Sequence, residues 1–183
     1  MNKVVAIVAV KKDSVRLKNK NIRLKNKKPL FMHSINPLLK SKIIDEIYIS
    51  TNSEIALNYC KKFKIKTIWR NYKNSRNNQP LLDVLQYSYR KIKKSYKYII
   101  TIMANCPGHS VRKVNECIKL IQKYKFKEVR SFNNQGEENG LMVFERKYFL
   151  KKKELSNYIG IIKSPAFEIH YLNEFQKFKK TNN

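Results

Sequence analysis

The chain has 183 residues, of which 42% are hydrophobic, and its 40 Lys and Arg against 13 Asp and Glu give a formal net charge of +27. This length predicts one domain over residues 1–183, and the apolar share, with eleven Tyr and nine Phe, excludes a chain too polar to fold. No stretch reaches the ~20 apolar residues of a membrane span and the N-terminus lacks a signal-peptide pattern, so we expect a cytoplasmic protein without a membrane partner.

The first half of the chain alternates between strand-like and helix-like patterns. It begins with "VVAIVAV", Val4–Val10, a continuous apolar and β-branched run that is typical of a strand buried on both faces. Ser53 has the side chain of a helix N-cap, and Pro37 is expected to kink or shorten the helix in which it lies. Helices are predicted over Leu30–Leu39 and from Ser53 to Phe63, and strands over Glu46–Thr51 and Lys66–Trp69.

The second half continues the alternation. Pro80 suits the first turn of a helix that carries Leu81 and Leu85 inward, and Ser110 suits the N-cap of the next helix. A last helix is expected over Asn173–Phe178. Strands are predicted over Tyr98–Met103, Glu128–Phe132, Leu141–Phe144, Tyr158–Ile162 and Phe167–His170, and Trp69, Cys117 and Met142 are expected in the core.

This alternation predicts an α/β fold, Rossmann-like and doubly wound, with a mostly parallel sheet and helices on both faces. Such sheets bind ligands in the crevice at the carboxyl ends of their strands. The segment Lys11–Lys28 leaves the first strand at that place, and nine of its eighteen residues are Lys or Arg. It contains no glycine, no GxxxxGK[ST] and no GxGxxG, so a triphosphate bound there would rest on side-chain cations and hydroxyls rather than on a Gly-rich loop.

The charge of the whole chain has two interpretations. One is an anionic partner, and the other is AT-rich codon usage, since Lys, Asn, Ile and Tyr are all abundant. A basic nucleic-acid-binding protein is the less favoured partner class, because the sequence shows no RNP aromatic pattern, no KH-type GXXG and no zinc spacing.

The three cysteines are Cys60, Cys106 and Cys117. They cannot all pair within one chain, and their spacing is not that of a metal site. We therefore expect them to be reduced and structural.

The basic segment also resembles a known family. "AVKKDSVRLKNKNI" is similar to the N-terminal motif P-A-R-S-G-S-K-R-I-P-x-K-N-I of the acylneuraminate cytidylyltransferases, the CMP-sialic acid synthetase type. Further similar stretches follow in the family's order along nearly the whole chain: "KKPLFMHSI", "IYISTNSEIA", "MANCPGHS", "ENGLMVFER" and "FEIHYLNEF". Many weak motifs in one order imply a shared fold.

The resemblance implies a reaction in which CTP is coupled to the anomeric hydroxyl of an acidic nine-carbon sugar and pyrophosphate is released, with Mg²⁺ as cofactor. The catalytic cations would be Lys11, Arg16 and Lys20, which neutralise the triphosphate. The nucleotide would be bound by Ser14, Asn21, Arg70 and Asp83.

The same resemblance assigns a sugar site and a metal site. His109, Asn139 and Gly140 would bind the sugar, and Glu168 and His170 align with the two metal-binding Asp residues of the family's D-I-D motif. His170 and Asp13, the latter in place of a glycine, depart from the family pattern. The chain is also shorter between residues 144 and 168, where the family has dimer contacts, so a homodimer is left open. A non-catalytic sugar-nucleotide-binding relative and a Kdo-type enzyme are the alternatives.

Overall fold

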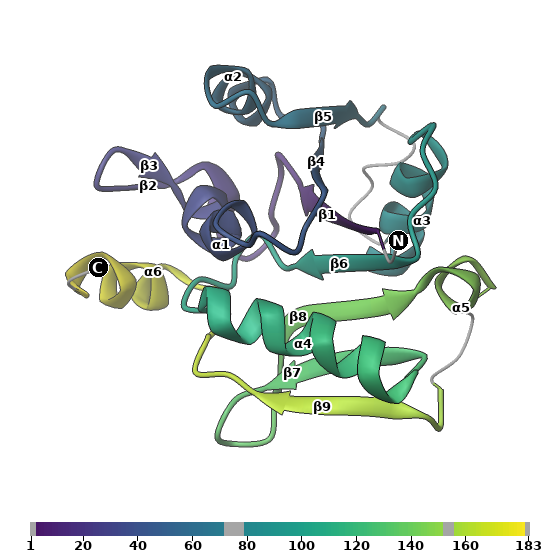
Figure 1. Cartoon of the computed structure of the whole chain (residues 1–183). Coiled ribbons are helices and arrows are strands. Elements are labelled where there is room, and N and C mark those ends of the chain that lie inside the picture. Colours follow the sequence, from purple (N-terminus) through teal and green to yellow (C-terminus); the bar gives the residue numbers. More distant parts are fainter. Residues whose placement is uncertain (1–2, 72–78, 152–155, 182–183) are drawn as a thin grey trace.

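The computed structural model describes residues 3–71, 79–151 and 156–181, and its centre is a seven-stranded sheet (Figure 1). The strand order is β5-β4-β1-β6-β8-β7-β9, in which only β8 runs against both of its neighbours. The strands are β1 (Val4–Val10), β4 (Glu46–Thr51), β5 (Lys66–Trp69), β6 (Tyr98–Ile102), β7 (Glu128–Phe132), β8 (Glu138–Glu145) and β9 (Ile159–Lys163).

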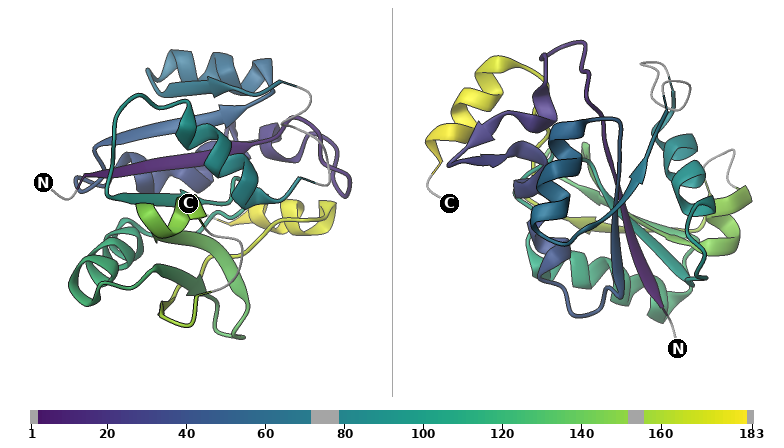
Figure 2. Two further views of the ribbon diagram at one scale, coloured as in Figure 1. Left: turned by 90° about the vertical axis from the view of Figure 1, so that its right-hand side faces the viewer. Right: turned by 90° about the horizontal axis from the view of Figure 1, so that it is seen from above.

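Helices cover both faces of this sheet (Figure 2), which confirms the predicted doubly wound α/β fold. The helices are α1 (Leu30–Leu39), α2 (Glu54–Lys62), α3 (Leu81–Arg90), α4 (Val111–Tyr124), α5 (Arg146–Lys151) and α6 (Leu172–Lys180). Alternate residues of β1 point to opposite faces of the sheet. Val4 and Val8 pack toward α1, α2 and α4, while Val5 and Ile7 pack toward α3 and α5.

Several local predictions about helix caps, Pro37 and the cysteines are confirmed. Ser53 accepts a bond from the backbone N–H of Ala56, and Ser110 accepts one from that of Lys113, so both serines cap their helices. Pro37 lies in the last turn of α1, which ends two residues later. The three cysteines are buried free thiols.

Two local predictions are wrong, and one helix was not predicted. Phe167–His170 is not a strand, because its backbone bonds the loop after β6 and the Glu174 side chain instead of another strand. For example, the N–H of Ile169 donates to the carbonyl of Asn105 (2.9 Å). α5 was not expected, since it follows β8 with no turn signal between them. Trp69 is 50% exposed because β5 is an edge strand, whereas Cys117 and Met142 are buried as expected.

The basic segment after β1 folds into a short 3₁₀ helix, η1 (Lys20–Ile22), and a small hairpin of β2 (Leu24–Lys25) and β3 (Lys28–Pro29). This hairpin lies beside α6 in Figure 1 and Figure 2. A small apolar cluster that includes Leu17, Ile169 and Phe175 joins the basic segment to the C-terminal residues. Within the described residues, no helix is both long enough and apolar enough to span a membrane.

Candidate functional site

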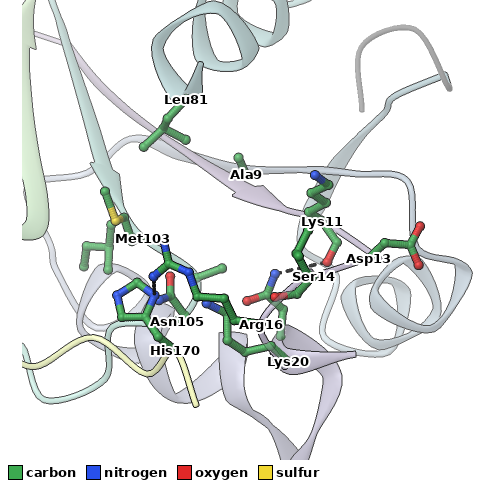
Figure 3. Close-up of a pocket in the computed structure, with 14 residues that line it drawn as sticks. Ala9, Lys11, Asp13, Ser14, Arg16, Lys20, Leu81, Met103, Asn105 and His170 are labelled. Carbon is green, nitrogen blue, oxygen red and sulfur yellow. Dashed lines mark hydrogen bonds between the residues drawn. The ribbon is translucent and has the colours of Figure 1, made fainter. Parts of the chain in front are cut away.

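A pocket of about 390 Å³ lies where β1 and β6 end (Figure 3). The chain leaves β1 for β4 on one side, and β6 lies on the other, so this is the point at which an open α/β sheet forms its ligand crevice. The cations of Lys11, Arg16 and Lys20 line the pocket together with Ser14 and Asn21. The structure thus brings all three expected catalytic cations to one place.

The loop after β1 that carries Lys11, Arg16 and Lys20, called the cationic loop below, contains no glycine. Side-chain hydrogen bonds fix its backbone instead. The Asn21 side-chain amide, which is 7% exposed, donates to the carbonyl of Lys11 (3.0 Å), and the backbone N–H of Lys12 donates to the Asn52 side chain (2.8 Å). Leu17 is buried, and Asn19 takes the left-handed conformation (φ 58°) that starts η1. These anchors alternate with the cations, so the cations are presented from a fixed backbone.

Burial and mutual repulsion act on these cations. The pKa of Lys20 is lowered by burial, although Glu168 partly offsets this, and the pKa of Lys11 is lowered by burial and by the nearby charge of Arg70. Burial lowers the pKa of Arg70 to about 10, which leaves it charged at neutral pH. An anion in the pocket would relieve the cost of holding these charges together, which makes the pocket a favourable phosphate site.

His170 connects the cationic loop to the C-terminal segment. The Arg16 guanidinium lies 3.0 Å from His170 Nδ1, and His170 Nε2 lies 2.8 Å from Glu168 Oε2. A guanidinium can only donate, so Nδ1 accepts from Arg16, and Nε2 carries the proton that is donated to Glu168. Glu174 accepts from the backbone N–H groups of His170 and Tyr171, which caps α6 and fixes this segment.

Glu168 and His170 do not fit a metal ion that they would share. Both ring nitrogens of His170 are engaged, one by a positively charged group, and Glu168 Oε2 is used by the same ring. The described residues also contain no group of three or more His, Cys, Asp or Glu side chains that could hold a metal. The Mg²⁺ assignment stays a prediction. In this structure, His170 instead bonds both Arg16 and Glu168.

The remaining nucleotide candidates lie farther from the pocket. Arg70 follows β5, is 2% exposed, and acts on the pocket through the electrostatic effect on Lys11. Asp83 lies in the first turn of α3 with its side chain exposed, and it is not among the pocket-lining residues. Their role in nucleotide binding stays a prediction.

His109 and Asn139, two of the expected sugar residues, form a buried hydrogen-bond network that does not line the pocket, and His109 lines a separate groove of about 770 Å³. His109 is 7% exposed and bonds Ser164 Oγ (2.8 Å) and the carbonyl of Asn139 (2.9 Å). The Asn139 amide donates to the carbonyls of Ser164 (2.8 Å) and Ala166 (2.9 Å), so the protein itself uses both donors. This network fixes the loop after β6, and the sugar contacts of His109 and Asn139 stay a prediction.

Gly140 does not line the pocket itself, but it contacts Met103, which does. Its carbonyl accepts from the Met103 backbone N–H (2.9 Å), and a Cβ on Gly140 would lie only 2.8 Å from Met103 Cγ. Met103 and Leu81 contribute apolar side chains to the pocket lining, and Asn105 lies next to His170 (Figure 3). Leu81 was expected to face inward from its helix and Asn105 lies in the stretch "MANCPGHS", but the sequence assigned neither a role at the site; the signal that could have found Asn105 is its place just after β6.

The His109 network predicts acid-sensitive stability. Burial lowers the pKa of His109 to about 4, and the bond to the Asn139 carbonyl offsets this only in part. The unfolded ring, with a pKa near ~6.5, binds a proton first, so stability is full above pH ~6.5 and falls as the pH drops toward 4. We expect a loss of about 3 kcal/mol over that window, measured by urea unfolding. A His109→Gln variant with the same pH dependence as the parent chain would contradict this.

Comparisons with known proteins bear on the family and the fold of the chain. Residues 5–133 match the family model described as Cytidylyltransferase. No curated protein matches the chain in sequence.

Solved structures are similar in fold over almost the whole chain. A CMP:2-keto-3-deoxy-manno-octonic acid synthetase complexed with CTP is 12% identical, with a TM-score of 0.80 and 97% of each chain covered. A cytidylyltransferase from Leptospira borgpetersenii is 11% identical with a TM-score of 0.74, covering 97% of this chain and 85% of that one. A Mycobacterium tuberculosis protein in complex with manganese is 6% identical with a TM-score of 0.73, covering 98% and 100%.

Proposed function

Because the chain belongs to the cytidylyltransferase family, we propose that it transfers the cytidylyl group of CTP to an acidic nine-carbon sugar of the sialic type. The observation that carries the proposal is the pocket after β1, in which Lys11, Arg16 and Lys20 converge from an anchored loop. A triphosphate and a sugar acid are both anionic, so a site that joins them needs fixed cations.

The proposed reaction exchanges one bond at phosphorus for another. The anomeric hydroxyl oxygen of the sugar attacks the α-phosphorus of CTP and releases its proton to solvent, and the bond from that phosphorus to the bridging oxygen breaks as pyrophosphate leaves. Lys11, Arg16 and Lys20 offset the charge of the phosphate oxygens and of the leaving group. Mg²⁺, the cofactor that the resemblance implies, would accompany the triphosphate during turnover, since phosphate oxygens are ligands that it prefers.

Two sugar classes are candidates. The stretches "NGLMVF" and "STNSEIA" resemble the sialic branch, which favours a nine-carbon acid. The fold similarity to a 2-keto-3-deoxy-manno-octonic acid synthetase supports an eight-carbon acid as the second candidate. Both sugars carry a carboxylate beside the anomeric carbon, so the cationic pocket alone does not discriminate between them.

The reaction is tested by incubating the chain with CTP and a panel of nine-carbon and eight-carbon acid sugars while pyrophosphate release is followed. We expect release that requires both substrates and is fastest with a nine-carbon acid. Faster turnover of the eight-carbon acid would select the second candidate. CTP binding without release for every sugar would favour a non-catalytic relative. Tight, steeply salt-dependent binding of nucleic acid without CTP binding would favour the nucleic-acid class.

Lys20 provides a test of the triphosphate site. Lys20→Ala is expected to weaken CTP binding about tenfold, or by about 1.4 kcal/mol, because a charge-assisted phosphate contact is lost. The matched control is Lys18→Ala, which removes an exposed cation from the same loop outside the pocket lining. Calorimetry should show a changed Kd only for Lys20→Ala, and equal affinities in both variants would place the triphosphate elsewhere.

A further inference from the structure

We propose that Arg16, oriented by His170 and Glu168, supplies to the triphosphate the positive charge that a divalent cation would supply, so that this chain binds CTP without a metal ion. The inference rests on the proposed function and concerns how the same pocket holds its nucleotide. It arises from the geometry at the C-terminal segment, where the Arg16 guanidinium contacts His170, and His170 in turn bonds Glu168, the other residue that the sequence resemblance assigns to a metal.

The first step is that the atoms of His170 and Glu168 that would bind a metal already make other contacts. His170 Nδ1 accepts from the Arg16 guanidinium at 3.0 Å, and Nε2 is 2.8 Å from Glu168 Oε2. A metal ion on Nδ1 would have to displace the guanidinium and would meet its charge at close range. Figure 3 shows the Asp13 carboxylate across the pocket from His170, so these two side chains do not converge on one ion.

The second step is the capacity of Arg16. A guanidinium has five N–H donors in a planar fork that matches phosphate oxygens, and the bond to His170 uses one nitrogen, Nη1. The side chain lines the pocket beside Lys20. His170 therefore acts as a positioning residue, which holds the fork of Arg16 at the pocket before the nucleotide arrives.

The third step is the rigidity of the support. Glu174 holds the backbone of His170 at the start of α6. At the other end of α6, the ammonium of Lys25, which is 1% exposed, donates to the Thr181 carbonyl (2.9 Å) and hydroxyl (2.7 Å). The same ammonium lies 4.0 Å from the centre of the Phe178 ring. Because α6 is fixed at both ends, His170 stays at the position from which it contacts Arg16.

The test is calorimetric titration of the full chain with CTP, once in EDTA and once in Mg²⁺, at one ionic strength. We expect Kd values within about threefold of each other for the parent chain. In EDTA, Arg16→Ala and His170→Ala should each raise Kd about tenfold, and the double variant should bind no worse than Arg16→Ala, because His170 acts through Arg16. His170→Asn, which keeps an acceptor for Arg16, should stay within about threefold of the parent. Lys179→Ala, an exposed charge on α6, is the matched charge control and should leave Kd unchanged.

Three outcomes would overturn the inference: CTP binding only with Mg²⁺, an unchanged Kd for His170→Ala in EDTA, or additive effects in the double variant. A Mn²⁺ titration of the nucleotide-free chain, followed by electron paramagnetic resonance, gives a second readout. A stoichiometric Mn²⁺ site that Glu168→Ala removes would also overturn it. Absence of CTP binding in both buffers would instead defeat the proposed function, so the two failures are distinguishable.

Discussion

Arg16→Ala is expected to lower kcat/KM for CTP by about 10²- to 10³-fold, the size of effect seen when one preorganised donor to developing charge is lost. Arg16 lines the pocket from the loop after β1 and is held there by His170. Its removal takes away both a fixed charge and a planar pair of donors. The measurement is steady-state pyrophosphate release at varied CTP and saturating acid sugar.

Arg16→Lys should recover part of this loss, because the charge is kept while the fork geometry is lost. The matched control is Arg112→Ala, which removes an exposed arginine on α4, outside the pocket. We expect this control to stay within twofold of the parent chain. An equal loss in Arg112→Ala would mean that the net charge of the protein matters instead of the position of Arg16.

Gly140→Ala is expected to cost about 2–3 kcal/mol of unfolding free energy, a combination of steric overlap and backbone strain. Gly140 has a φ of +80°, and its added Cβ would lie 2.8 Å from Cγ and 2.9 Å from Cβ of Met103. Met103 cannot move away without disturbing the end of β6, because its backbone N–H is bonded to Gly140. Thermal unfolding should show a fall in Tm of roughly 5–10 °C.

Gly136→Ala separates the two causes. Gly136 has nearly the same φ, +81°, but an added Cβ would meet nothing within 4 Å. The strain alone should cost about 1 kcal/mol. If the two variants lose the same stability, the contact between Gly140 and Met103 does not constrain the pocket wall.

The architecture could be predicted from the sequence because its signals are local. The run Val4–Val10 must be buried on both faces, and serine caps mark the starts of α2 and α4. The position of the cationic loop then follows, since a segment that leaves a parallel strand at its carboxyl end lies over the ligand crevice. Lys11, Arg16 and Lys20 reach the pocket for that reason.

The contacts that orient the site could not be predicted, because they join residues far apart in the chain. Arg16 and His170 are separated by 154 positions, and His109 and Ser164 by 55. Nothing in the stretch around His109 indicates that Ser164 and Asn139 draw its ring into a buried network. The stretch Phe167–His170 has an apolar pattern close to that of a strand, but its partner is a loop, which periodicity does not reveal.

A crystal structure of the chain in complex with CTP tests the central claim most directly. The account predicts the triphosphate between Lys11, Arg16 and Lys20 in the pocket after β1, with the guanidinium of Arg16 still bonded to His170. Phosphate density in the separate groove of about 770 Å³, which is lined by residues of α1 and α6 together with Lys28 and Lys40, would contradict it.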